Sequence, residues 1–306
     1  MDSWLTTVGL PIALAIVMLG LGLGLSVADF RRVAAYPLLM LIALVCQVVV
    51  LPAVCFGLVL AFGLEPELAV GMMLLAASPG GTTANLYSHL FGGHVAVNVT
   101  LTAVNSVLAV VTLPVVVNLS TDYFRPDSQA VGLQFDKVLQ VFAIVLVPVS
   151  LGMVIRSRFP AFADRLAKPV KILSAVLLVA VIAGAILNER ANLADYFVAV
   201  GAIVLIFNLI SLAIGYGAPR LAGMGKPESI AAGMEIGIHN STLAIAIAVS
   251  PALLDNTRIA IPAAVYGIVM FFTAAAFGYV VSRRQEPADA TPAERADRAR
   301  AEGAGQ

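Results

Sequence analysis

The stretch GMEIGIHNST, residues 233–242, places a carboxylate, an imidazole and an amide inside a long apolar run. Glu235, His239 and Asn240 interrupt a sequence that is otherwise rich in Ala, Ile, Leu and Val. A charge at the centre of a lipid bilayer costs at least ~2.5–3.5 kcal/mol on insertion scales, so such a residue is by default a candidate functional residue. If this run crosses a membrane, Glu235 marks a site.

The composition indicates a membrane protein. Of 306 residues, 60% are hydrophobic and 12% are charged, with a mean hydropathy of +0.97. Soluble domains are nearer to about 45–50% apolar and about a quarter charged. The net charge of zero gives no reason to expect nucleic acid as a partner. The two cysteines, Cys46 and Cys55, lie in one apolar segment and form neither a disulfide framework nor a zinc spacing.

Apolar runs long enough to cross a bilayer core of about 30 Å recur along the chain. We expect an all-α polytopic membrane protein, with a transmembrane domain at 1–282 and a disordered, charged tail at 283–306. The N-terminus has no basic n-region and no small-residue cleavage site, so the first run is interpreted as a span. About nine transmembrane helices are predicted, at 5–26, 38–62, 68–88, 95–119, 138–155, 170–187, 196–218, 229–250 and 259–281.

The distribution of Lys and Arg predicts the orientation. With the N-terminus outside, thirteen of these 18 residues fall on the cytoplasmic side, four fall outside, and Lys171 lies at the mouth of a span. Cytoplasmic loops carry the excess of positive residues. We therefore expect a cytoplasmic C-terminus and residence in the plasma (inner) membrane.

The third and eighth predicted spans are interrupted. The third contains Ser78-Pro79-Gly80-Gly81, where proline removes a backbone donor and glycine tolerates non-helical geometry. The eighth carries Gly233 and Gly237 around Glu235. Paired interruptions in corresponding segments point to a transporter binding site at the midplane. The offset of five spans between the two breaks is odd, which predicts that the two discontinuous helices belong to an inverted repeat.

Simpler explanations exist for both features of the eighth span. Gly233 and Gly237 form a small-xxx-small pattern, which is common where membrane helices pack closely. Glu235 could be a protonated carboxyl group that donates to a neighbouring carbonyl. The close-packing alternative does not account for the carboxylate.

The polar residues near the breaks predict a cation site. Asn85 follows the break in the third span, while Asn98 and Thr102 lie four apart on the fourth span and share a face. Gln47 lies in the second span. Carboxylate, amide, hydroxyl and unwound carbonyl oxygens suit a hard cation such as Na⁺. Individually, Thr102 could bond to a backbone carbonyl, and Asn98 could bridge two helices.

The same breaks predict an anion site. Half-helix N-termini expose unpaired N–H groups and the positive end of a helix dipole. The spans contain no central Lys or Arg that could serve instead. A carboxylate-bearing substrate is expected near the residues that follow the breaks, which are Thr82, Thr83, Asn240 and Ser241.

Four segments resemble the bile acid/sodium symporter family, and the similarity runs from about residue 5 to residue 282. The hallmark segments are SPGGTTANLYSHLFGGHVAVNVTLTAVNS (78–106) and EIGIHNSTLAIAIA (235–248). QVVVLP (47–52) resembles the Gln-to-Pro stretch one helix earlier. MLGLGLGLSVADFRR (18–32) resembles the first helix and its cytoplasmic end.

The resemblance implies a core domain around two crossing helices, from spans at 38–119 and 196–281, and a panel domain from spans at 5–26 and 138–187. It implies uptake of organic anions, such as bile acids or other carboxylates, coupled to two sodium ions. The positions that match the first ion are Asn85, Thr102 and Glu235, with Asn98 and Ala84 where the family usually has serine. Those that match the second are Gln47, Glu235, the carbonyls of Ile236 and Ile238, and His239 where the family has glutamine.

His239 is the departure with the largest consequence. A neutral imidazole nitrogen is a poor sodium ligand, and a protonated imidazole repels the ion. Because the ordinary pKa of histidine is about 6.5, His239 could carry a coupled proton in place of one or both ions. Alternatively, a ring nitrogen donates to a carbonyl and His239 only spaces the helices.

The sequence favours a transporter over other classes. Catalysis is disfavoured, because there is no H-E-x-x-H and no second central carboxylate. A proton-coupled or uncoupled organic-anion transporter stays open as the alternative, followed by a non-transporting sensor. A metalloid exporter would use Cys46 beside Gln47, although apolar packing is the commoner role of such a cysteine. The expected partners are a small organic anion and the lipid bilayer, with no obligate protein partner evident.

Overall fold

The computed structural model describes residues 35–81, 83–125, 135–166, 193–250 and 253–283, and short pieces within 15–26 and 169–176. At 135–146, 193–197 and 199 it describes the backbone alone. This part of the chain is helical apart from one isolated antiparallel bridge. Four of its helical segments are long and apolar enough to cross a membrane, namely Pro37–Phe62, Val95–Phe124, Val200–Leu221 and Thr257–Arg283. The expectation of an all-α polytopic membrane protein is therefore supported.

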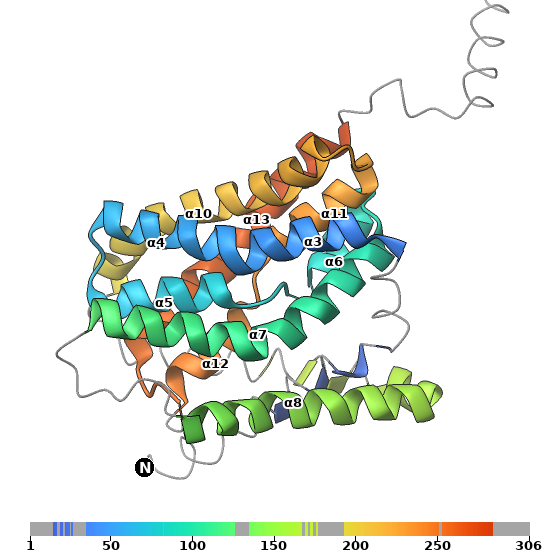
Figure 1. Cartoon of the computed structure of the whole chain (residues 1–306), viewed down its shortest axis with the longest axis horizontal. Coiled ribbons are helices and arrows are strands. Elements are labelled where there is room, and N and C mark those ends of the chain that lie inside the picture. Colours follow the sequence, from blue (N-terminus) through green and yellow to red (C-terminus); the bar gives the residue numbers. More distant parts are fainter. Residues whose placement is uncertain are drawn as a thin grey trace, which may run out of the picture.

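The helices form one bundle, with α8 along one flank (Figure 1). In chain order the elements are α3 (Pro37–Val45), the π-helical η3 (Cys46–Val50), α4 (Leu51–Phe62), α5 (Pro66–Ala77), α6 (Thr83–Leu90), α7 (Val95–Phe124), α8 (Phe135–Arg158), α10 (Leu193–Leu221), α11 (Lys226–Gly237), α12 (Ser241–Val249) and α13 (Thr257–Arg283).

Two of the predicted spans are divided, and they are the two in which the sequence predicts an interruption. The span at 68–88 consists of α5 and α6, and the span at 229–250 consists of α11 and α12. Five other predicted spans each coincide with one helical stretch. The first and sixth, 5–26 and 170–187, lie largely outside the described residues, so the count of nine and the division into core and panel remain predictions.

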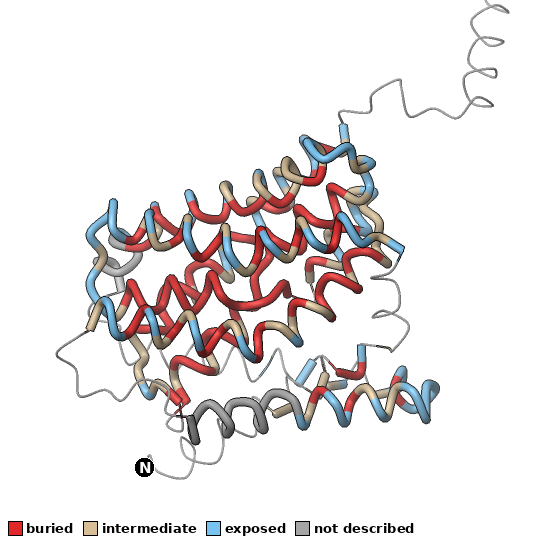
Figure 2. Tube along the Cα trace, in the orientation of Figure 1, coloured by how far each residue is buried: buried red, intermediate tan, exposed pale blue. Residues whose placement is uncertain are grey.

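The first halves of the two divided spans form the centre of the bundle. Every residue from Leu68 to Ala77 of α5 and from Ser229 to Gly237 of α11 is buried. Both halves lack a polar face, and such helices must be enclosed on all sides. Helices α7, α10 and α13 pack around them (Figure 2). The candidate site residues of α11 are thereby buried within the bundle.

Close packing joins α10 to α11. A Cβ atom on Gly215 would lie 2.8 Å from Ile236 Cβ and 3.0 Å from the Ala232 carbonyl oxygen. One on Gly233 would lie 3.2 Å from Tyr216 Cβ. The close-packing explanation for Gly233 is therefore confirmed, and it operates beside the buried carboxylate rather than instead of it.

The π-helical turn in the second span has a local cause. Pro52 has no N–H group, and its ring excludes the carbonyl four residues earlier from normal helical geometry. The backbone responds by widening, and the Leu51 N–H donates to the Cys46 carbonyl, five residues back. Such single-turn bulges occur frequently at functional sites. This one carries Gln47, which is buried.

Candidate functional site

The two breaks lie directly against each other. Gly80 and His239 form the isolated antiparallel bridge. The Gly81 N–H donates to the Ile238 carbonyl at 2.6 Å, and the Asn240 N–H donates to the Pro79 carbonyl at 2.8 Å. Each break therefore satisfies backbone groups that the other has released from helical bonding, which is what permits irregular backbone inside a membrane protein.

Glu235 lies at this junction, fully buried near the end of α11. Its Oε2 accepts from Thr102 Oγ1 at 2.5 Å, and its Oε1 accepts from Asn105 Nδ2 at 3.2 Å. The Gly80 N–H is a third donor. The Asn105 and Gly80 N–H groups can only donate to the carboxyl group, and the Thr102 hydroxyl can also donate to it. The alternative in which it donates to a neighbouring carbonyl finds no such bond among the described residues.

Three polar residues of α7 bring that helix against α11. Asn98, Thr102 and Asn105 lie at i, i+4 and i+7, which places them on one face. Asn98 Nδ2 donates to the Ala231 carbonyl at 2.7 Å, which confirms that it bridges two helices. Asn105 was missed by the sequence reasoning, although its position three residues after Thr102 could have revealed it.

The Thr102 hydroxyl has one proton and two acceptors. Besides Glu235 Oε2, its Oγ1 lies 3.1 Å from the Asn98 carbonyl oxygen. Donation to that carbonyl would leave the hydroxyl lone pairs and one carboxylate oxygen free for a cation. The pair can thus change from a hydrogen bond to two cation ligands by rotation of a single O–H bond.

Four amide oxygens on η3, α6 and α7 have no donor among the described residues. Each is the buried carbonyl atom of an Asn or Gln side chain and has no hydrogen-bond partner among the described residues: Gln47 Oε1, Asn85 Oδ1, Asn98 Oδ1 and Asn105 Oδ1. Buried polar atoms are nearly always paired, so a group of orphaned acceptors calls for an explanation. A cation or an ordered water supplies what these oxygens lack.

His239 lies in an aromatic enclosure. Its ring stacks on Phe207 at a centroid distance of 5.6 Å and meets the edge of Tyr266 at 5.3 Å. Nδ1 is 3.2 Å from the Ser78 carbonyl oxygen and must donate, because that oxygen can only accept. Nε2 is then the bare nitrogen of a neutral ring, and it is buried with no partner in the described part of the chain.

Several polar atoms at the positions that match the family's second ion already form hydrogen bonds within the protein. Gln47 turns its Nε2 toward Ser78 O, at 2.9 Å, and toward His239 Nδ1, at 3.5 Å. The Ile238 carbonyl is occupied by the Gly81 N–H, and Ile236 is buried beside it. The next carbonyl, that of Gly237, accepts from Asn208 Nδ2 at 2.8 Å and Tyr266 OH at 2.9 Å. Sequence reasoning missed both of these donors.

Two half-helices begin immediately after the breaks, α6 at Thr83 and α12 at Ser241. Asn240 Oδ1 caps α12 by accepting from the Leu243 N–H at 3.0 Å. Ser241 Oγ is buried and has no partner among the described residues. Thr82, also expected at the substrate site, lies outside the described residues.

The described residues contain no group of three or more His, Cys, Asp or Glu side chains that could hold a metal ion. Both cysteines are buried and unpaired by disulfide. Cys55 Sγ donates to the Met72 carbonyl at 3.4 Å, which is a packing role. The groups that meet at the two breaks include the oxygen atoms of Glu235 and Thr102, which are suited to a hard cation.

Comparison with known proteins points in the same direction. The model of the sodium bile acid symporter family matches residues 11–196. A sodium-dependent transporter of Bacillus subtilis, YocS, is 28% identical over 266 residues, covering 87% of this chain and 80% of the relative. The probable sodium/metabolite cotransporter BASS2 of rice is 26% identical, covering 94% and 67%. The rabbit ileal sodium/bile acid cotransporter is 28% identical, covering 76% and 67%.

Proposed function

The chain belongs to the sodium bile acid symporter family, and from this premise we propose that it couples the uptake of a small organic anion to sodium at Glu235. The family consists of transporters, so the chain is not an enzyme. The observation that carries the proposal is the buried carboxylate at the junction of two helix breaks, hydrogen-bonded to Thr102 and Asn105 of α7.

The proposed cation site uses Glu235 and Thr102, together with the side-chain oxygens of Asn85 and Asn98. Sodium turns the Thr102 proton toward the Asn98 carbonyl and takes its place between hydroxyl and carboxylate. The Asn85 and Asn98 oxygens then gain the positive partner that they lack. Gln47, Ile236, Ile238 and His239 belong to the second ion position of the family pattern. In this structure Gln47 Nε2 and His239 Nδ1 bind the Ser78 carbonyl, and the Ile238 carbonyl accepts from the Gly81 N–H.

The proposed anion position is the mouth of the two half-helices, at Thr82, Thr83, Asn240 and Ser241. Helices α6 and α12 both begin there, and the positive end of a helix dipole stabilises a carboxylate without a basic side chain. Sodium beside the break holds these helix ends in place, so anion affinity rises when the cation is bound. Alternating access would then move the core domain against the panel domain.

The chain is an integral membrane protein, and we infer a plasma (inner) membrane orientation with the C-terminus in the cytoplasm. The inference rests on the distribution of Lys and Arg described above. The ends of α5, α7 and α13 that carry Glu65, Arg125 and Arg258 would then face outward.

Proton coupling is the second candidate, and one observation favours it. His239 Nε2 is buried, faces no donor among the described residues, and belongs to a ring whose other nitrogen is committed to Ser78 O. A proton could be accepted there in place of the second sodium. Neither a sensor nor a metalloid exporter has an observation of this kind in its favour.

The decisive experiment measures the thermal unfolding midpoint of the purified protein against NaCl, with choline chloride as the ionic-strength control. An ion that binds only the folded state stabilises it by mass action and so raises the midpoint. At an ion concentration of a hundred times its Kd, the gain in stability is about 2.7 kcal/mol. We expect a sodium-specific rise in the wild type at pH 8 that is absent in Glu235→Gln.

The same series at pH 6 and pH 8, with His239→Gln, separates the two couplings. A sodium response at both pH values in His239→Gln but only at pH 8 in the wild type would indicate competition between sodium and a proton at His239. A rise in Glu235→Gln equal to that of the wild type would refute the sodium site.

A further inference from the structure

A narrow cavity lies between the second predicted span, the end of α5 and α7. Its polar lining consists of Gln47, Asn105 and Thr112, and the rest is Ala, Pro and Val. A body the size of one water molecule fits inside, and little more. On α7 the lining follows one face from Asn105 to Val116, so the cavity runs from the level of Glu235 toward the end of α7 near Arg125.

Two amide oxygens are committed to this cavity by the hydrogen bonds of their own nitrogens. Asn105 Nδ2 donates to the Glu235 carboxylate, and Gln47 Nε2 donates to the Ser78 carbonyl. Both acceptors are oxygen atoms, so neither amide can be reversed without loss of its bond. The opposite atoms, Asn105 Oδ1 and Gln47 Oε1, are buried without a partner among the described residues. Both residues are more than nine-tenths buried.

Thr112 supplies a third oxygen. Its hydroxyl donates to the Leu108 carbonyl at 3.1 Å, so the proton is used within α7. The lone pairs of Oγ1 remain available as acceptors. The half-buried position of Thr112, two helical turns from Asn105, places it nearer the open end of the cavity.

The charges around the cavity favour a cation. No Lys, Arg or His contributes to its lining. The end of α5, at Ala77, also lines it, and the C-terminus of a helix carries partial negative charge. Asn105 lines the cavity and is hydrogen-bonded to the Glu235 carboxylate.

We propose that this cavity is a separate sodium-binding site, formed by Gln47 Oε1, Asn105 Oδ1 and Thr112 Oγ1. It lies across Gln47 from His239 and across Asn105 from Glu235. Sodium bound there is one side chain away from the carboxylate, so the cavity would also load the main site. This inference rests on the proposed sodium coupling, but it concerns different atoms and can fail separately.

Binding of ²²Na⁺ to the purified full-length protein tests the proposal, with choline chloride to hold ionic strength. Thr112→Val removes the oxygen and preserves the shape, so we expect half-saturation to require about tenfold more sodium, the usual effect of one lost contact to a charged group. Thr112→Ser keeps the oxygen and should resemble the wild type. Thr121→Val is the matched control, because Thr121 makes the same bond to the carbonyl four residues earlier but lies outside the cavity lining.

Filling the cavity with a larger side chain provides a second test of the proposal. Ala109 lines the cavity, and Ala109→Leu should lower the sodium bound at saturation by one ion per chain while leaving an ion that depends on Glu235. If Thr112→Val equals Thr121→Val while Glu235→Gln abolishes binding, the cavity holds only water and the proposal fails, with the proposed function intact. If the wild type binds no sodium and Glu235→Gln changes nothing, both fail. Loss of all sodium in Ala109→Leu would show that the cavity is not a separate site.

Discussion

The Glu235 carboxylate occupies its place because residue 80 has no side chain. A Cβ atom built on Gly80 would overlap the carboxylate oxygens, while the Gly80 N–H donates to them. Backbone of one break thus touches the side chain of the other. Any larger residue at position 80 must move the carboxylate or the break.

Gly80→Ala should therefore separate folding from ion binding. We expect overpacking to cost about 1–3 kcal/mol of stability, and the displaced carboxylate to lose its sodium-dependent rise in unfolding midpoint. Thermal unfolding in choline chloride and in NaCl measures both effects.

The control for that substitution is Gly57→Ala in α4, where the added carbon meets no atom within 4 Å. It should raise the midpoint slightly through better helix propensity and keep the sodium response. A Gly80→Ala protein with a normal sodium response would contradict the contact between Gly80 and Glu235.

At the scale of elements, the bundle depends on how closely α10 approaches α11. The neighbours of Gly215 include the backbone of Ala232 and Gly233, which cannot turn aside as a flexible side chain can. Gly217, two residues along the same helix, has no neighbour within 4 Å of the corresponding position. Helix packing of this kind transmits strain, because interiors are close-packed.

The pair Gly215→Ala and Gly217→Ala tests that packing. Gly215→Ala should lose about 1–3 kcal/mol through overpacking, whereas Gly217→Ala should gain up to about 1 kcal/mol from better helix propensity. The unfolding midpoints of the two variants, measured in the same detergent, test this difference in stability. Equal midpoints would mean that α10 and α11 lie farther apart than described.

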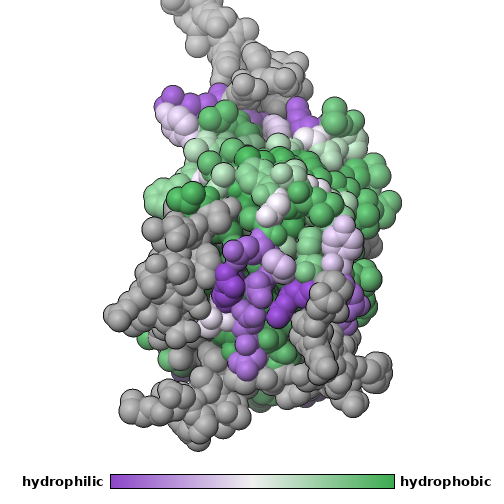
Figure 3. All heavy atoms as spheres, turned by 90° about the vertical axis from the view of Figure 1, so that its left-hand side faces the viewer, coloured by the Kyte–Doolittle hydropathy of each residue, from purple (hydrophilic) through white to green (hydrophobic). Residues whose placement is uncertain are grey.

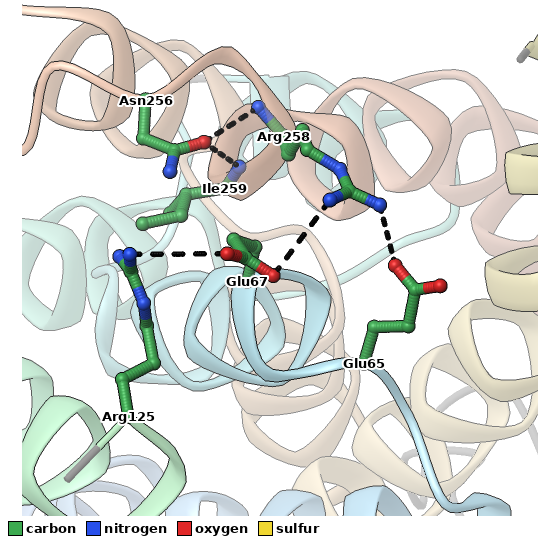
Figure 4. Close-up of polar contacts among 6 residues, drawn as sticks. All are labelled: Glu65, Glu67, Arg125, Asn256, Arg258 and Ile259. Atoms are coloured by element: carbon green, nitrogen blue, oxygen red, sulfur yellow. Dashed lines mark hydrogen bonds and ion pairs between the residues drawn. The ribbon is translucent and has the colours of Figure 1, made fainter. Parts of the chain in front are cut away.

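At the scale of the whole molecule, charged side chains join three helix ends. Arg258 at the start of α13 contacts Glu65 and Glu67 beside α5, and Arg125 after α7 lies 3.8 Å from Glu67 (Figure 4). Asn256 Oδ1 accepts the N–H groups of Arg258 and Ile259, which fixes the start of α13. Figure 3 looks onto this end of the molecule, where hydrophilic side chains gather below a largely apolar flank.

Arg258→Gln should loosen this end in a salt-dependent manner. Partly exposed pairs contribute about 0.2–1 kcal/mol each, and salt screens them. We expect a lower unfolding midpoint at low ionic strength, and a difference from the wild type that shrinks in concentrated choline chloride.

Arg156→Gln is the control. It removes one ion pair, between Arg156 of α8 and Asp164, and should lower the unfolding midpoint less than Arg258→Gln does. A loss of stability in Arg258→Gln that high salt leaves unchanged would show that packing, not charge, is what Arg258 supplies.

Features that depend on residues close together in the sequence were predictable from the sequence alone. Long apolar runs need a bilayer or a helical interior, so composition predicted the class. Pro79 and its glycines cannot continue a helix, so the break between α5 and α6 was predictable from residues 78–81. A lone carboxylate in an apolar run has few explanations, which made Glu235 conspicuous.

Only the tertiary structure determined which residues far apart in the sequence are in contact. Asn105 reaches Glu235 across 130 positions, and the Gln47 amide meets Ser78 across 31. Such contacts depend on how far each helix is rotated about its axis, and hydropathy does not encode that rotation for helices that are apolar all round. The direction of each amide, and with it the cavity of donor-free oxygens, follows from which carbonyl or carboxylate lies opposite, and packing determines that.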